Sequence, residues 1–116
     1  MIKYGPVDPA NCEFVPVARV GDLPNGERLF VDIDDETIVI FNIAGGYFAI
    51  GDVCSHDDGP VGDGTLEDYA IACPRHGATF DVRTGKVLSL PAVVDIPAYP
   101  VRVNGEDIEI GLPIAA

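Results

Sequence analysis

Short apolar runs, interrupted every few residues by glycine or proline, set the pattern of the chain. The runs are rich in β-branched and aromatic residues, which favour the pleated, half-buried surface of a sheet. No stretch of twelve residues free of glycine and proline has the i, i+3, i+4, i+7 apolar spacing of an amphipathic helix. The pattern predicts nine short strands, at residues 14–20, 28–33, 37–43, 47–53, 69–72, 79–81, 86–88, 99–103 and 107–110.

Turn residues separate these runs. Asn25-Gly26 and Asn104-Gly105 suit turns that need a positive φ, and Gly45-Gly46 suits a tight reversal. The length of 116 residues leaves room for one domain. Short strands joined by such turns predict an all-β fold, a small sandwich or barrel, rather than alternating β-α-β units.

The charge balance limits the partners. The chain has 7 Lys and Arg against 19 Asp and Glu, a net charge of −12. Phosphate binding needs clustered Lys and Arg, so nucleic acid and anionic membranes are excluded as partners. An acidic surface suits instead a partner with a basic docking face.

The expected compartment of the chain is inferred from two sequence patterns, a signal peptide and a membrane helix. Its first residues show no signal-peptide pattern, and its longest apolar runs fall far short of the ~20 residues of a membrane helix. Three irregularly spaced cysteines do not form a disulfide framework. We therefore expect a cytoplasmic protein with reduced thiols, and a monomer.

Both histidines of the chain closely follow a cysteine. One group is Cys54-Ser55-His56, the other is Cys73-Pro74-Arg75-His76, and the sixteen residues 57–72 separate them. Each group comes after a predicted strand, so each lies on a loop held by a sheet. Chance placement of this kind is improbable, and we interpret the two cysteines and two histidines as metal ligands.

Two metal sites are compatible with this donor set. Zinc takes two Cys and two His in a tetrahedron, usually grouped as Cys-x₂₋₄-Cys and His-x₃₋₅-His. Here each loop carries one sulfur and one nitrogen donor, which suits a binuclear cluster better: each loop gives a thiolate to one iron and an imidazole to the other. This is the ligand set of Rieske 2Fe–2S centres. An assay of acid-labile sulfide separates the two hypotheses.

The spacing Cys-x-His, sixteen residues, Cys-x-x-His resembles the motif of the Rieske family. The similarity continues in Gly77 and in residues 80–86, and Ser89-Leu90-Pro91-Ala92 resembles the proline loop that covers the cluster in Rieske-type ferredoxins. It spans residues 14–112, which leaves 1–13 as an N-terminal arm and 113–116 as a C-terminal tail.

The resemblance implies a small antiparallel β-sandwich with a cluster-binding subdomain, formed by two loops and the proline cover loop. It also implies one Rieske-type 2Fe–2S cluster, with Cys54 and Cys73 on the inner iron and His56 and His76 on the outer iron near the surface.

The function implied by the resemblance is electron transfer. A ferredoxin of this kind passes single electrons from a flavin-dependent reductase to a terminal non-haem iron oxygenase. The chain itself lacks a second site, because a mononuclear iron needs two more histidines and a carboxylate. We therefore expect no catalytic activity. The alternatives are an accessory protein of iron–sulfur assembly or redox sensing, and the small subunit of a nitrite reductase.

Differences from the family's high-potential members indicate a low reduction potential. Gly59 and Arg75 stand where those members carry two disulfide-forming cysteines. Ala78 and Phe80 stand where they place Ser and Tyr hydroxyls near the cluster sulfurs. Missing hydrogen-bond donors disfavour the extra negative charge of the reduced state. The two aspartates after His56 are expected to act in the same direction.

Two other features are not interpreted as sites. Cys12 has no partner in the motif and is expected to be structural or incidental. The acidic residues Asp32, Asp34, Asp35 and Glu36 lack the spacing of a calcium loop, so we expect a solvated turn.

Overall fold

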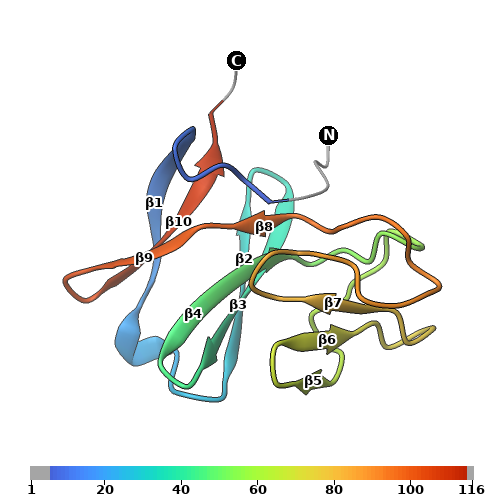
Figure 1. Cartoon of the computed structure of the whole chain (residues 1–116). Coiled ribbons are helices and arrows are strands. Elements are labelled where there is room, and N and C mark those ends of the chain that lie inside the picture. The colour runs from blue at the N-terminus through green and yellow to red at the C-terminus, as the bar shows by residue number, and fades with distance from the viewer. Residues whose placement is uncertain (1–5, 115–116) are drawn as a thin grey trace.

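Ten strands and one short 3₁₀ helix form the described part of the chain, residues 6–114 of a computed structural model (Figure 1). The elements are β1 (Cys12–Arg19), η1 (Val20–Asp22), β2 (Arg28–Ile33), β3 (Glu36–Ile43), β4 (Gly46–Gly51), β5 (Leu66–Glu67), β6 (Ala70–Ala72), β7 (Thr79–Asp81), β8 (Ala98–Tyr99), β9 (Val101–Asn104) and β10 (Asp107–Pro113). Within these residues, no helix is long and apolar enough to cross a membrane.

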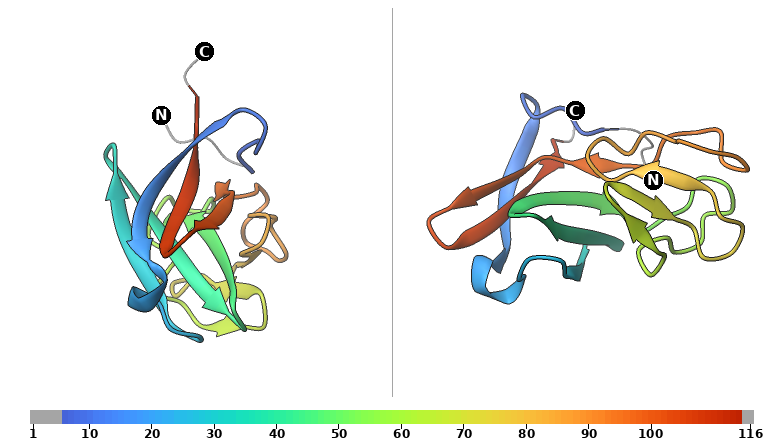
Figure 2. Two further views of the ribbon diagram at one scale, coloured as in Figure 1. Left: turned by 90° about the vertical axis from the view of Figure 1, so that its left-hand side faces the viewer. Right: turned by 60° about the horizontal axis from the view of Figure 1, so that its bottom comes forward.

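The strands pair into three antiparallel sheets, with orders β1-β10-β9, β2-β3-β4-β8 and β5-β6-β7. The first two sheets form the layers of a sandwich, and the small third sheet lies at one end of the molecule (Figure 2). The predicted all-β antiparallel sandwich is therefore confirmed.

Strand β3 explains how the third sheet is attached. Its residues from Ile38 to Phe41 are all buried, because both faces of the strand are covered. Ile38 and Ile40 point into the core shared with Ile108 of β10. Val39 and Phe41 point into a second core that contains the buried cysteines and the small sheet. Side chains alternate between the faces of a strand, so one strand supplies both cores.

Most predicted strands are present, two of them with the predicted bounds, β2 and β7. The predicted strand 99–103 is wrong as a single element. It divides at Pro100 into β8, which pairs with β4, and β9, which pairs with β10. Proline has no N–H to donate to a ladder, and this marks the place where the chain changes sheets.

At the small sheet one further prediction fails, and one observed strand was not predicted. Residues 86–88 are not a strand, since only Val87 forms a bridge, to Phe80. The Lys86 carbonyl accepts from the Asp81 N–H and the Leu88 N–H donates to the Thr79 carbonyl, whereas the N–H of Val87 donates to the Asp95 side chain. The two-residue strand β5 was not predicted, because so short a segment has no alternation to detect.

The described arm lies against the sandwich. Pro6 forms a parallel bridge with Ala98, and the N–H of Val7 donates to the Ala98 carbonyl at 2.7 Å. β1 begins at Cys12 and β10 ends at Pro113, so paired strands extend slightly beyond residues 14–112. Residues 1–5 of the expected arm and 115–116 of the expected tail lie outside the described residues.

Gly64 is the tightest point of the segment between the two Cys/His groups. A Cβ on this residue would lie 1.7 Å from the Ala72 carbonyl oxygen, which belongs to the backbone of β6. The N–H of Ala72 donates to the Thr65 carbonyl at 3.0 Å, so neither backbone segment is free to move apart.

We predict that Gly64→Ala destabilises the fold by at least about 2 kcal/mol, because overpacking against backbone forces a chain shift. Urea unfolding followed by circular dichroism measures the effect. Gly21→Ala is the matched control, since nothing lies within 4 Å of its added Cβ, and it should change the free energy of unfolding by less than about 0.5 kcal/mol. Equal stabilities of the two variants would contradict the packing described for Gly64.

Candidate metal centre

The first Cys/His group forms a closed loop after β4. The Cys54 N–H donates to the Gly59 carbonyl at 2.7 Å, and the Asp58 N–H donates back to the Cys54 carbonyl at 2.7 Å. Asp58 has a φ of 59°, the left-handed conformation that such a tight return requires. Cys54 is completely buried, whereas His56 is exposed.

The second group repeats this geometry after β6. The Cys73 N–H donates to the Ala78 carbonyl at 2.7 Å, and the Gly77 N–H donates to the Cys73 carbonyl at 3.0 Å. Gly77, at a φ of 76°, takes the left-handed position. Cys73 is buried and His76 is exposed. The two loops therefore have equivalent backbone hydrogen bonds. In each loop the cysteine N–H donates one bond and the cysteine carbonyl accepts another.

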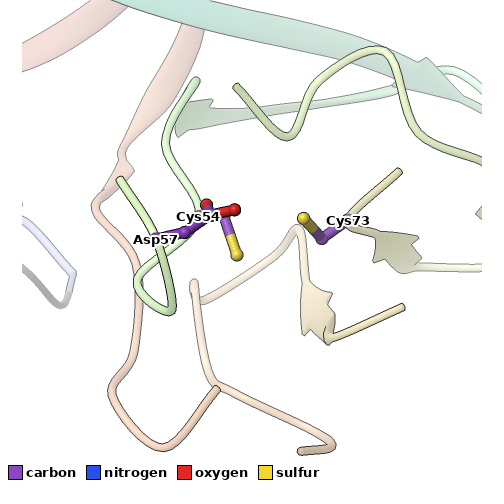
Figure 3. A group of neighbouring side chains, drawn as sticks. All are labelled: Cys54, Asp57 and Cys73. Carbon is purple, nitrogen blue, oxygen red and sulfur yellow. The ribbon is translucent and has the colours of Figure 1, made fainter. Parts of the chain in front are cut away.

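The structure brings all four predicted residues together. The Cys54 and Cys73 sulfurs lie within 4.8 Å of each other, between the two loops (Figure 3). Ring nitrogens of His56 and His76 also lie within 4.8 Å of each other, and the ring centroids are 5.1 Å apart with planes at 88°. The arrangement is an inner pair of sulfurs and an outer pair of imidazoles.

Burial raises the pKa of the Cys54 thiol, and the neighbouring Cys73 thiol raises it further. The raised pKa favours the neutral Cys54 thiol as long as no cation is bound beside it. Iron binds thiolate and neutral imidazole, and it supplies the positive charge that lets a buried thiol ionise. The donor set therefore fits a Rieske 2Fe–2S cluster, with two sulfurs out of water and two imidazoles at the surface.

An ion pair that was not predicted joins the two loops. Arg75 donates from Nε to Asp57 Oδ2 at 2.5 Å and from Nη2 to Oδ1 at 2.8 Å. These bonds hold the pKa of Asp57 well below its ordinary value, and Asp57 raises the pKa of the Arg75 guanidinium. The effect of Asp57 on the potential stays a prediction, and the structure adds the positive charge of Arg75 beside its carboxylate.

The segment after β7 lies beside both loops. The Ser89 hydroxyl accepts from the Thr79 N–H at 3.1 Å and lies 2.7 Å from the Thr79 hydroxyl. The Ser55 hydroxyl, in the first loop, donates to the Val94 carbonyl. Leu90 and Val93 between these tethers are each 74% exposed. The predicted proline loop thus presents aliphatic side chains to solvent next to the Cys/His loops.

Two positions near the sulfurs carry no hydroxyl. Ala78 and Phe80 are completely buried in the same core as Cys54 and Cys73. Neither side chain has a hydrogen-bond donor, as the sequence indicated. The serine tethers and the ion pair were missed, because the residues that form them are far apart in the sequence and common on surfaces.

A β-sandwich that presents two buried cysteines and two exposed histidines on equivalent loops defines the class of Rieske-type iron–sulfur proteins. A model of the Rieske [2Fe-2S] domain family matches residues 13–100. The chain therefore belongs to the Rieske [2Fe-2S] domain family, and it carries one Rieske-type 2Fe–2S cluster.

Known relatives of the chain include ferredoxins. The 3-phenylpropionate/cinnamic acid dioxygenase ferredoxin subunit of Shigella boydii serotype 4 (strain Sb227) is 46% identical over 97 residues, 83% of this chain and 91% of that protein. The ferredoxin of carbazole 1,9a-dioxygenase from Nocardioides aromaticivorans IC177 is 32% identical, with a TM-score of 0.77, and the match covers 84% of this chain and 95% of that one.

A further solved structure is a complex of reduced oxygenase and oxidized ferredoxin in carbazole 1,9a-dioxygenase. The matched chain is 25% identical, with a TM-score of 0.78, and the match covers 87% of this chain and 94% of that one. This protein is an electron-transfer component of the ferredoxin type.

Proposed function

We propose that Cys54 and Cys73 bind the inner iron of the cluster, that His56 and His76 bind the outer iron, and that the protein carries single electrons to a terminal oxygenase. The contrast in burial carries this proposal: both sulfurs are enclosed, and both imidazoles face solvent. A cluster held in this way supplies one-electron chemistry, at a potential raised because two neutral imidazoles replace two thiolates.

The exposed imidazoles define the end of the molecule at which a redox partner docks. His56 and His76 are exposed, and the segment that carries the exposed Leu90 and Val93 is joined to the first loop by the hydrogen bond from the Ser55 hydroxyl to the Val94 carbonyl. A small apolar patch within an acidic surface gives a modest interface that forms quickly and dissociates quickly, as turnover requires.

The relatives support an oxygenase as the electron acceptor, since one of them is a dioxygenase ferredoxin subunit and another was solved with its oxygenase. As donor we propose a flavin-dependent reductase, because a flavin can accept a hydride and a one-electron carrier cannot. We also propose a cytoplasmic monomer. All three cysteines, which lie within residues 6–114, are free of disulfides, as is usual in a reducing compartment.

The ligand assignment predicts that His56→Ala and His76→Ala each abolish or strongly change the visible spectrum of the cluster, since one iron loses a ligand. Cys12→Ser is the matched control and should leave the spectrum intact, because its sulfur contacts the Pro9 carbonyl in the arm, at 3.5 Å. His56→Cys should keep a cluster at a lower potential, as thiolate ligation does. Wild-type iron, sulfide and spectrum in both alanine variants would refute the assignment.

The reduction potential is predicted to lie near the lower end of the Rieske range of ~−150 to +300 mV. Ala78 and Phe80 offer no hydroxyl to stabilise the reduced state. Protein-film voltammetry at pH 7 measures it directly. A value above about +100 mV would show that other groups stabilise the reduced state.

Binding to the reductase and to the oxygenase is predicted to weaken about tenfold or more between 50 and 500 mM salt, because a charge of −12 acts through exposed groups that salt screens. Titration calorimetry in sodium chloride, with sucrose at equal osmolality as the control, tests this. Affinities that do not depend on salt would contradict docking by charge.

A further inference from the structure

Arg75 reaches from the second Cys/His loop into the first. Its guanidinium makes two hydrogen bonds to the Asp57 carboxylate, and its third nitrogen, Nη1, donates to the Pro60 carbonyl at 2.7 Å. The Asp57 Oδ1 atom also accepts from the Gly59 N–H at 3.0 Å. One side chain of the second loop thus bonds both to a side chain and to the backbone of the first loop.

Gly59 leaves the space that the guanidinium fills. A Cβ on this residue would lie 2.7 Å from both Cζ and Nη2 of Arg75. Gly59 is not among the glycines with positive φ, so its backbone conformation does not itself require glycine. Because Gly59 has no side chain, the Arg75 guanidinium can lie close to its backbone.

Among the residues that the structure describes, one other ion pair, Arg19–Glu106, joins distant parts of the chain, and it differs from this pair. The side chains of Arg75 and Asp57 are 34% and 26% exposed, whereas those of Arg19 and Glu106 are 63% and 73% exposed. Bidentate bonds between a guanidinium and a carboxylate are stronger and more directional than single contacts, and partial burial reduces screening. The exposed pair contributes little.

The ion pair lies directly beside the two imidazoles along the chain. Asp57 follows His56, and Arg75 precedes His76. A bond between Asp57 and Arg75 therefore restrains the separation of the two histidines, while the cysteines are already restrained by burial and by the loop hydrogen bonds. The histidines are the exposed ligands, so they depend most on such a restraint.

We propose that Arg75, Asp57 and the gap at Gly59 form a non-covalent cross-link between the two loops that positions His56 and His76 as ligands of the outer iron. Arg75 and Asp57 are positioning residues, since they act through the histidines. This inference rests on the proposed ligand assignment. It adds the residues that keep the two exposed ligands in place.

The test compares Arg75→Gln, Asp57→Asn and Gly59→Ala with Arg19→Gln, which removes the same charge from the exposed pair. Each purified holoprotein is mixed with an excess of iron chelator, and the loss of the visible absorbance of the cluster is timed. The g-values of the reduced protein are recorded by electron paramagnetic resonance, because they respond to ligand geometry and not to overall stability.

We expect about tenfold faster cluster loss and shifted or broadened g-values in all three variants of the cross-link. Gly59→Ala keeps both charges, so its effect reports geometry alone. Arg75→Lys, which keeps the charge and loses the bidentate fork, should fall between wild type and Arg75→Gln. Arg19→Gln should match wild type in both measurements.

Cluster loss and g-values in Arg75→Gln and Gly59→Ala that match those of Arg19→Gln would overturn the cross-link while leaving the ligand assignment intact. An Arg75→Lys variant that behaves as wild type would also overturn the cross-link, because a positive charge without the bidentate hydrogen bonds would then be enough to position the histidines. A wild-type protein that assembles no 2Fe–2S cluster would instead refute the proposed ligand site itself.

Discussion

The backbone hydrogen bonds that close the two Cys/His loops are the constraint on which the site depends. Each cysteine N–H bonds to the carbonyl five residues further on, and each cysteine carbonyl accepts from the N–H four residues further on. In each loop this closure turns the cysteine sulfur inward and the histidine imidazole outward. The double-sided burial of β3 then anchors the subdomain of these loops to the sandwich.

Much of the fold could be predicted from the sequence, because strand alternation and glycine-containing turns are local signals. β2 and β7 have the predicted bounds, and the two Cys/His groups that the spacing singled out lie together in the structure. The failures were non-local. Whether residues 99–103 continue one ladder or divide between two sheets depends on partner strands elsewhere in the chain. Whether residues 86–88 form a strand, rather than a single bridge, also depends on such partners.

The ion pair between the loops shows the same limit at the site. An arginine and an aspartate eighteen residues apart give no sequence signal of contact. Their positions beside the two histidines gain meaning only when the loops are folded against each other. The pair also changes the electrostatics, since it adds a dipole rather than a net charge next to the imidazoles.

We propose that two imidazoles and two buried thiolates of this chain hold one 2Fe–2S cluster. Pulsed electron paramagnetic resonance of the reduced protein, prepared with ¹⁵N-labelled histidine, detects the imidazole ligands themselves. We expect coupling of the unpaired electron to nitrogens of two histidines, with two acid-labile sulfides per chain. A cluster without histidine coupling, or a zinc-containing protein without sulfide, would contradict it.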